Sequence, residues 1–210
     1  MTTSRSVFLL NSFSLLLVLG LIVYTKLFGP SVKSLFLHPP SYPQFNIALL
    51  THTFQTLCSI PPIICAFSFA LLRTIQPHRK ENVFILYSAL ITGGFLVNEI
   101  YRIHILLTTV GIPKLLTVSV YTIFLIAYGV VFKQRIRATP YPILLIGIGL
   151  LFTGITVDSL HLSGGSLPSL LEGIPKLFSE INISLYFWFV CYQEVMRSFN
   201  SSRILDSNSL

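Results

Sequence analysis

Three acidic residues, Glu99, Asp158 and Glu180, stand inside long apolar segments of the chain. An ionisable side chain near the centre of a membrane helix costs roughly 2.5–3.5 kcal/mol on insertion scales, so it needs a partner, water or a function. Counted at about 1.5 Å per residue from the expected cytoplasmic ends of their helices, the three acids lie roughly 25, 24 and 26 Å into the membrane. We therefore predict that three different helices bring carboxylates to one level in the outer leaflet.

The residues near these acids extend the pattern. Arg102 follows Glu99 and His161 follows Asp158 at i, i+3, a spacing that places two side chains on one helix face. His52 lies near the outer end of another apolar segment. Carboxylates and imidazoles of this kind bind cations or relay protons in membrane proteins. The predicted binding site consists of Glu99, Arg102, Asp158, His161, Glu180 and His52.

One helix face indicates where Asp158 points. Gly147, Leu151 and Gly154 share a face with Asp158 and His161 at helical spacing. Small residues let membrane helices approach closely, so this face is expected to contact another helix. We therefore expect Asp158 to point into the bundle rather than toward lipid.

Two structural interpretations stay open beside the functional one. The acids could meet water or lipid headgroups near the membrane surface, or they could form buried ion pairs that only orient helices. Carboxylates with His52 and His161 could also ligate zinc and activate water for hydrolysis. However, the sequence has no H-E-x-x-H pattern, so we predict neither a metal nor a cofactor.

The elements that must position these residues follow from composition. Hydrophobic residues make up 53% of the 210 residues and charged residues only 10%, whereas a soluble domain averages roughly 25% charged residues. The apolar residues come in continuous runs, and a bilayer core requires about 20 helical residues to cross. We predict an all-α fold, a polytopic transmembrane helix bundle forming a single domain over residues 1–198, with a disordered cytoplasmic tail at 199–210. The six predicted spans are 8–28, 46–72, 83–107, 115–132, 143–162 and 177–196.

The distribution of basic residues predicts the orientation, because Lys and Arg are retained on the cytoplasmic side. One set of alternate loops and ends carries nine of them (Arg5, Arg73, Arg79, Lys80, Lys133, Arg135, Arg137, Arg197, Arg203). The other set carries five (Lys26, Lys33, Arg102, Lys114, Lys176). Both termini are therefore expected in the cytoplasm. The net charge of +7 reflects this topology signal and does not indicate a nucleic-acid partner.

A stretch before the last apolar segment carries a resemblance. It reads Leu170-Leu171-Glu172-Gly173-Ile174-Pro175-Lys176-Leu177-Phe178 and is followed by an apolar, aromatic segment. It resembles a part of uncharacterised bacterial multi-pass membrane proteins in which acidic residues, a Gly and a Lys precede the last span. The resemblance implies a bacterial plasma membrane as the location and brings no activity with it.

The expected function is the binding or movement of a small solute or ion through a polar cavity open to the outside. A metal-dependent membrane hydrolase is one alternative, and a bound metal would distinguish it. A structural or sensory subunit acting through a protein partner is the other. The sequence predicts the lipid bilayer as a partner and does not identify a protein partner.

Overall fold

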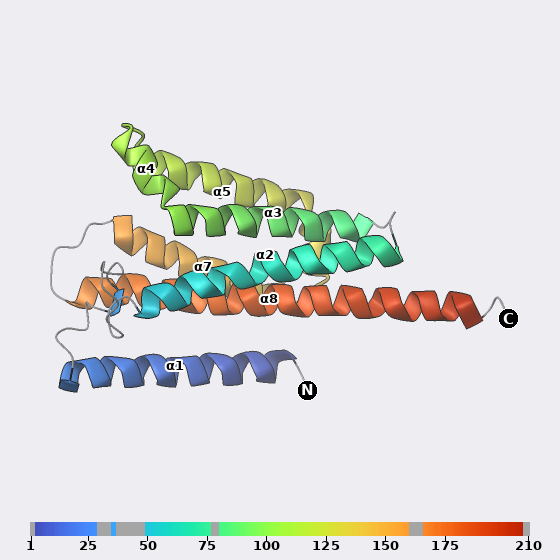
Figure 1. Cartoon of the computed structure of the whole chain (residues 1–210), viewed down its shortest axis with the longest axis horizontal. Helices are drawn as coiled ribbons and strands as arrows, with labels where there is room; N and C mark the ends of the chain where they lie inside the picture. The colour runs from blue at the N-terminus through green and yellow to red at the C-terminus, as the bar shows by residue number, and fades with distance from the viewer. Residues whose placement is uncertain (1–2, 29–34, 37–48, 77–79, 160–165, 208–210) are drawn as a thin grey trace. The chain divides into compact units, whose positions relative to one another are not determined.

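The computed structural model describes residues 3–28, 35–36, 49–76, 80–159 and 166–207, and the described residues form helices and no strand (Figure 1). This confirms the predicted all-α class. The α-helices are α1 (Thr3–Phe28), α2 (Leu49–Ile75), α3 (Lys80–Tyr101), α4 (Ile103–Thr109), α5 (Lys114–Val131), α6 (Lys133–Arg137), α7 (Tyr141–Ser159) and α8 (Ser166–Ser207).

Four helices in the described part of the chain are long and apolar enough to cross a membrane. They are the stretches Arg5–Phe28, Leu49–Ile75, Glu81–Tyr101 and Tyr141–Asp158. The α5 helix supplies a shorter apolar stretch, Leu115–Val131. The last predicted span, 177–196, lies inside α8 but is not one of the four.

The predicted span 83–107 is not one continuous helix. α3 ends at Tyr101, and α4 begins at Ile103 after a break at Arg102. Arg102 has φ 51° and ψ 46°, the left-handed conformation, which a non-glycine residue seldom adopts. The Arg102 carbonyl oxygen accepts hydrogen bonds from the amides of Ile105 and Leu106, at 2.8 and 3.1 Å, in the first turn of α4.

The α8 helix extends beyond the predicted span at both ends. It begins at Ser166. Pro168 does not prevent this start, because it lies in the first turn, where the amide hydrogen that proline lacks would have no helical partner. At the other end it continues to Ser207, so residues 199–207 are helical where composition predicts disorder. Residues 208–210 lie outside the described part.

The chain divides into two compact units, which we describe separately. Unit 1 contains Met1–Leu57 and Pro142–Leu185, and unit 2 contains Cys58–Tyr141 and Tyr186–Leu210. The division falls within α2 and within α8, so these two helices contribute residues to both units.

In unit 1, α7 packs antiparallel against α8 through the glycine face that the sequence predicts. A Cβ atom added to Gly147 would lie 2.8 Å from Ile183 Cγ1 and 3.2 Å from the Ser179 carbonyl oxygen. One added to Gly154 would lie 2.7 Å from Lys176 Cγ. At both positions, a larger residue would push the helices apart.

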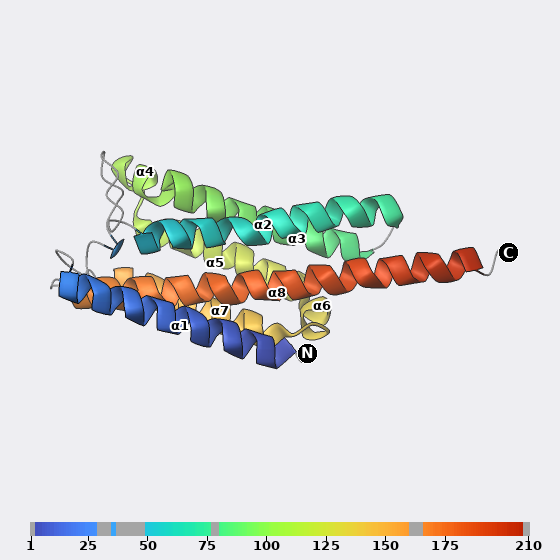
Figure 2. The same ribbon diagram turned by 60° about the horizontal axis from the view of Figure 1, so that its bottom comes forward.

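A pair of amide side chains joins α1 to α8 in the same unit. Asn11 Nδ2 donates to Asn182 Oδ1 at 3.2 Å, and Asn182 Nδ2 donates to Asn11 Oδ1 at 3.0 Å. Each amide also donates to a carbonyl four residues earlier in its own helix, Val7 or Phe178. Figures 1 and 2 show α1 and α7 alongside the N-terminal part of α8. Hydrogen bonds between helices are worth about 0.6–2 kcal/mol each in membrane proteins.

In unit 2, α3 and α5 run antiparallel and are joined by a hydroxyl pair and by aromatic contacts. The oxygens of Ser88 and Tyr128 lie 2.6 Å apart. One turn earlier on α3, the Phe84 ring packs against Tyr128 and Phe132, with ring centroids 5.9 and 5.4 Å away. On α3, Gly93 faces Pro62 of α2.

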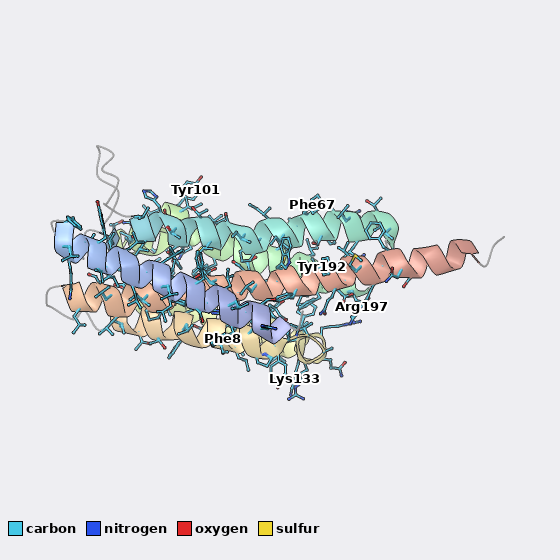
Figure 3. All side chains as sticks on the ribbon, turned by 90° about the horizontal axis from the view of Figure 1, so that it is seen from below. Phe8, Phe67, Tyr101, Lys133, Tyr192 and Arg197 are labelled. Atoms are coloured by element: carbon cyan, nitrogen blue, oxygen red, sulfur yellow. The ribbon has the colours of Figure 1, made fainter. Side chains whose placement is uncertain are left out.

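The surface carries many large apolar side chains, although the buried residues are also mostly apolar. Large apolar side chains lie on the outside, such as Phe8 at 71% exposure in unit 1 and Phe67 and Tyr101 at 66% and 73% in unit 2 (Figure 3). Polar side chains of α8 are buried instead, including Ser179, Glu180 and Asn182.

The α7–α8 contact predicts the effect of adding one methyl group. Gly147→Ala places a Cβ against Ile183 and the α8 backbone, and overpacking of this kind costs about 1–3 kcal/mol. Gly149→Ala, on the same helix with nothing within 4 Å of its Cβ, is the matched control and should leave stability unchanged or slightly raised. Thermal unfolding of the purified variants measures both effects. Equal unfolding temperatures for the two variants would contradict the close helix contact.

Candidate functional site

A lysine of α8 lies between two carboxylates, one from its own helix and one from α7. Lys176 Nζ donates to Glu172 Oε1 at 2.7 Å and lies 3.5 Å from Asp158 Oδ2. The side chains of Lys176, Glu172 and Asp158 are 20%, 36% and 30% exposed, respectively. We call Asp158, Glu172 and Lys176 the charged cluster.

Helix packing in unit 1 brings the charged cluster together. Glu172 and Lys176 are one turn apart on α8, so they share a face. Gly154, one turn before Asp158 on α7, lies directly against the Lys176 side chain and the Glu172 carbonyl oxygen. Because Gly154 has no side chain, the lysine stem passes close to α7 and its ammonium group reaches Asp158.

The charged cluster carries more negative than positive charge. Two carboxylates contact one ammonium group, and hydrogen bonds between such ionised groups are stronger than neutral ones. A carboxylate has about four lone-pair sites, so it accepts further donors or a cation beside the lysine. The partial exposure of all three side chains lets a small ligand reach them.

Of the predicted site residues in unit 1, the structure places Asp158 in the charged cluster. Glu180 is on α8, one turn further along than Lys176, and only 2% exposed. The α8 charges at the level of Asp158 are therefore Glu172 and Lys176. His52 is exposed on α2. His161, the expected partner of Asp158, lies outside the described residues.

The other two predicted residues, Glu99 and Arg102, belong to unit 2. Both are partly buried. The prediction that they share a face of one helix is wrong, because α3 ends at Tyr101 and Arg102 has a left-handed backbone. A common level for Glu99, Asp158 and Glu180 stays a prediction.

Sequence reasoning missed Glu172 and Lys176 as members of the site. From the sequence, Lys176 is assigned to an outer loop, and Glu172 is named only as part of the segment 170–178 that resembles other membrane proteins. The available signal was their i, i+4 spacing, which favours an ion pair once the segment is helical. That signal required α8 to begin near Ser166 instead of at 177.

The described residues offer no group of three or more His, Cys, Asp and Glu side chains that could hold a metal ion. The charged cluster contributes two carboxylates, and its third member is a lysine. The zinc hydrolase considered from the sequence therefore has no ligand set in the described part of the chain.

The fold and the charged cluster define an all-helical protein with several membrane-length helices and a charged contact between two of them. The chain belongs to the family described as Domain of unknown function (DUF8692), which matches residues 15–191. This match covers nearly all the helices and every residue of the charged cluster. No curated protein and no solved structure matches the chain.

Removing the ammonium group tests the charged cluster. Lys176→Met leaves the carboxylates of Asp158 and Glu172 without this cation between them, and breaking such a partly buried pair should cost about 1–3 kcal/mol. Arg197→Met is the control, because the Arg197 side chain is 60% exposed although its partner Glu194 on the same helix is 12% exposed, and an ion pair with one solvated partner should contribute at most about 1 kcal/mol. Chemical unfolding followed by circular dichroism measures both. Equal losses would show that the cluster is no more than a surface ion pair.

Proposed function

We propose that this protein is a multi-pass membrane protein that binds a small cation at the carboxylates of Asp158 and Glu172. Lys176 would act as the built-in cation with which the ligand competes. The observation that carries this proposal is the bridging position of Lys176 Nζ, 2.7 Å from Glu172 and 3.5 Å from Asp158, in a partly exposed cluster with excess negative charge.

The distribution of apolar and polar side chains supports a location in the membrane. Exposed side chains such as Phe8, Phe67 and Ile123 would contact lipid, which is as apolar as they are. The four membrane-length helices would then be joined by α5 and α8 to give six spans, with both termini in the cytoplasm. The resemblance of residues 170–178 favours a bacterial plasma membrane.

The properties of α8 support its role as the sixth span. Its polar residues lower its hydropathy, but Ser179, Glu180, Asn182 and Ser184 are all buried against protein. A helix surrounded by other helices does not require a lipid-compatible surface on every side. Hydropathy alone therefore underestimates the tendency of such a helix to span the bilayer.

The chemistry of the cluster favours a cation over an anion. Carboxylates supply oxygen ligands, which suit hard cations, and they accept hydrogen bonds from protonated amines. Binding a cation would offset the excess negative charge, whereas an anion would be repelled by both acids. Glu180, one turn deeper on α8, would supply the next carboxylate for an ion that moves past the cluster.

The proposal predicts stabilisation by a cation that depends on the cluster. Purified protein is titrated with sodium, potassium, magnesium, calcium and methylammonium chlorides at constant ionic strength, and its unfolding temperature is measured. A ligand at 100 times its dissociation constant stabilises the folded state by about 2.7 kcal/mol. We expect one of these cations to stabilise the parent protein, and Asp158→Asn and Glu172→Gln to remove the response.

Glu194→Gln is the matched control, because Glu194 is also an acid of α8 with a basic partner, Arg197, but lies outside the cluster. It should retain the full response. Stabilisation of equal size in Asp158→Asn and the parent, or none in the parent, would contradict the proposal.

A further inference from the structure

Two cysteines in unit 2 place their sulfur atoms in contact. Cys65 of α2 and Cys191 of α8 have Sγ atoms 3.8 Å apart, and neither is in a disulfide. The two residues are 126 positions apart in the sequence, so only the packing of α2 against α8 brings them together. Both are buried, at 0% and 2% exposure. The charged cluster contains neither residue, so this pair is a separate feature of the protein.

We infer that Cys65 and Cys191 are an intramembrane redox pair that forms a disulfide when an oxidant dissolved in the bilayer, an organic hydroperoxide, reaches them. A disulfide has an S–S length of about 2.05 Å, so the sulfurs must approach by less than 2 Å. Small rotations about the Cα–Cβ bonds and slight helix movements supply a shift of that size. The choice of an apolar oxidant rests on the membrane location proposed above, whereas the disulfide rests on the sulfur contact.

The surroundings of the pair favour Cys191 as the attacking thiol. Ser68 is buried on α2 one turn after Cys65, and its hydroxyl lies near Cys191. A hydroxyl that donates to this sulfur stabilises the thiolate, which is the nucleophile in the attack. Cys65 then serves as the second thiol, which completes the disulfide.

The reaction balances with the hydroperoxide as the two-electron oxidant. The Cys191 sulfur attacks the terminal peroxide oxygen, the O–O bond breaks, and the thiol proton passes to the departing oxygen, giving an alcohol and a sulfenic acid. The Cys65 sulfur then attacks the sulfenic sulfur, the S–S bond forms, and hydroxide leaves with the Cys65 proton as water. Two thiols and one hydroperoxide thus give one disulfide, one alcohol and one water.

The disulfide would tie α2 to α8 within unit 2. Without it, the contact between the two sulfur atoms is non-covalent, whereas the disulfide prevents the separation of the two helices at this point. A lipid hydroperoxide formed in the bilayer would therefore fix the distance between α2 and α8 at this point, through the Cys65–Cys191 disulfide.

The chain provides its own control for a labelling experiment, because its third cysteine, Cys58, is also buried on α2. The reduced protein in saturated phosphatidylcholine vesicles is treated with cumene hydroperoxide, denatured, and reacted with a polyethylene-glycol maleimide that adds one mass tag per thiol. We expect the parent to fall from three tags to one, and Cys58→Ala to fall from two tags to none. Dithiothreitol should restore every lost tag.

Cys191→Ala lacks the attacking thiol and should keep both remaining tags under the same treatment, whereas Cys65→Ala should lose one tag, because Cys191 is oxidised to a sulfenic acid that no second thiol converts to a disulfide. Tetrathionate, a charged oxidant confined to water, should leave the parent with three tags. The inference is overturned if the parent keeps three tags with cumene hydroperoxide, if the Cys65→Ala variant loses both of its tags, or if tetrathionate acts as well as the hydroperoxide. These readouts do not involve cation binding, so they fail or succeed independently of the charged cluster.

Discussion

The structure depends on one constraint: the amide and charged side chains of α8, such as Asn182 and Lys176, must find their partners inside the protein. Unpaired polar groups are costly away from water, and a bilayer offers them no replacement. Asn182 meets this requirement with Asn11 of α1, and Lys176 meets it with Asp158 of α7. Each pairing also fixes which neighbouring helix lies on which face of α8. The polar residues that lower the hydropathy of this helix therefore specify its packing.

Close helix contact and charge pairing occur on the same face of α7. Gly147 and Gly154 let α7 approach α8 closely enough for backbone and side-chain contact. Asp158 continues that face by one turn and reaches Lys176. The short distance between the helices is thus what allows a lysine to pair with an acid of another helix. A site built on packed helices holds its side chains more precisely than a site on loops, which suits the cation site proposed above.

The continuous apolar runs of the sequence are sufficient to predict the all-α class, and the spacing of Gly147 and Gly154 is sufficient to predict the face of α7 that packs on α8. It failed where local backbone geometry or tertiary contacts decide the outcome. The left-handed backbone of Arg102, where α3 ends, could not be predicted from the residue type, because glycine or asparagine usually occupies such a position. The start of α8 at Ser166 was not predicted, because Pro168 is of a residue type that usually interrupts helices, although it is compatible with a first turn. Lys176 was consequently treated as a loop residue, and its pairing with Asp158 could not be predicted.

The central claim is that α8, although polar, crosses the membrane. Single cysteines are introduced at Leu167 and at Asn200, both exposed near opposite ends of α8, in a variant whose native cysteines are replaced by alanine. Intact cells are treated with a maleimide that cannot cross the membrane. The account predicts labelling at position 167 from outside and labelling at position 200 only after the cells are permeabilised. Labelling of both positions from the same side would contradict it.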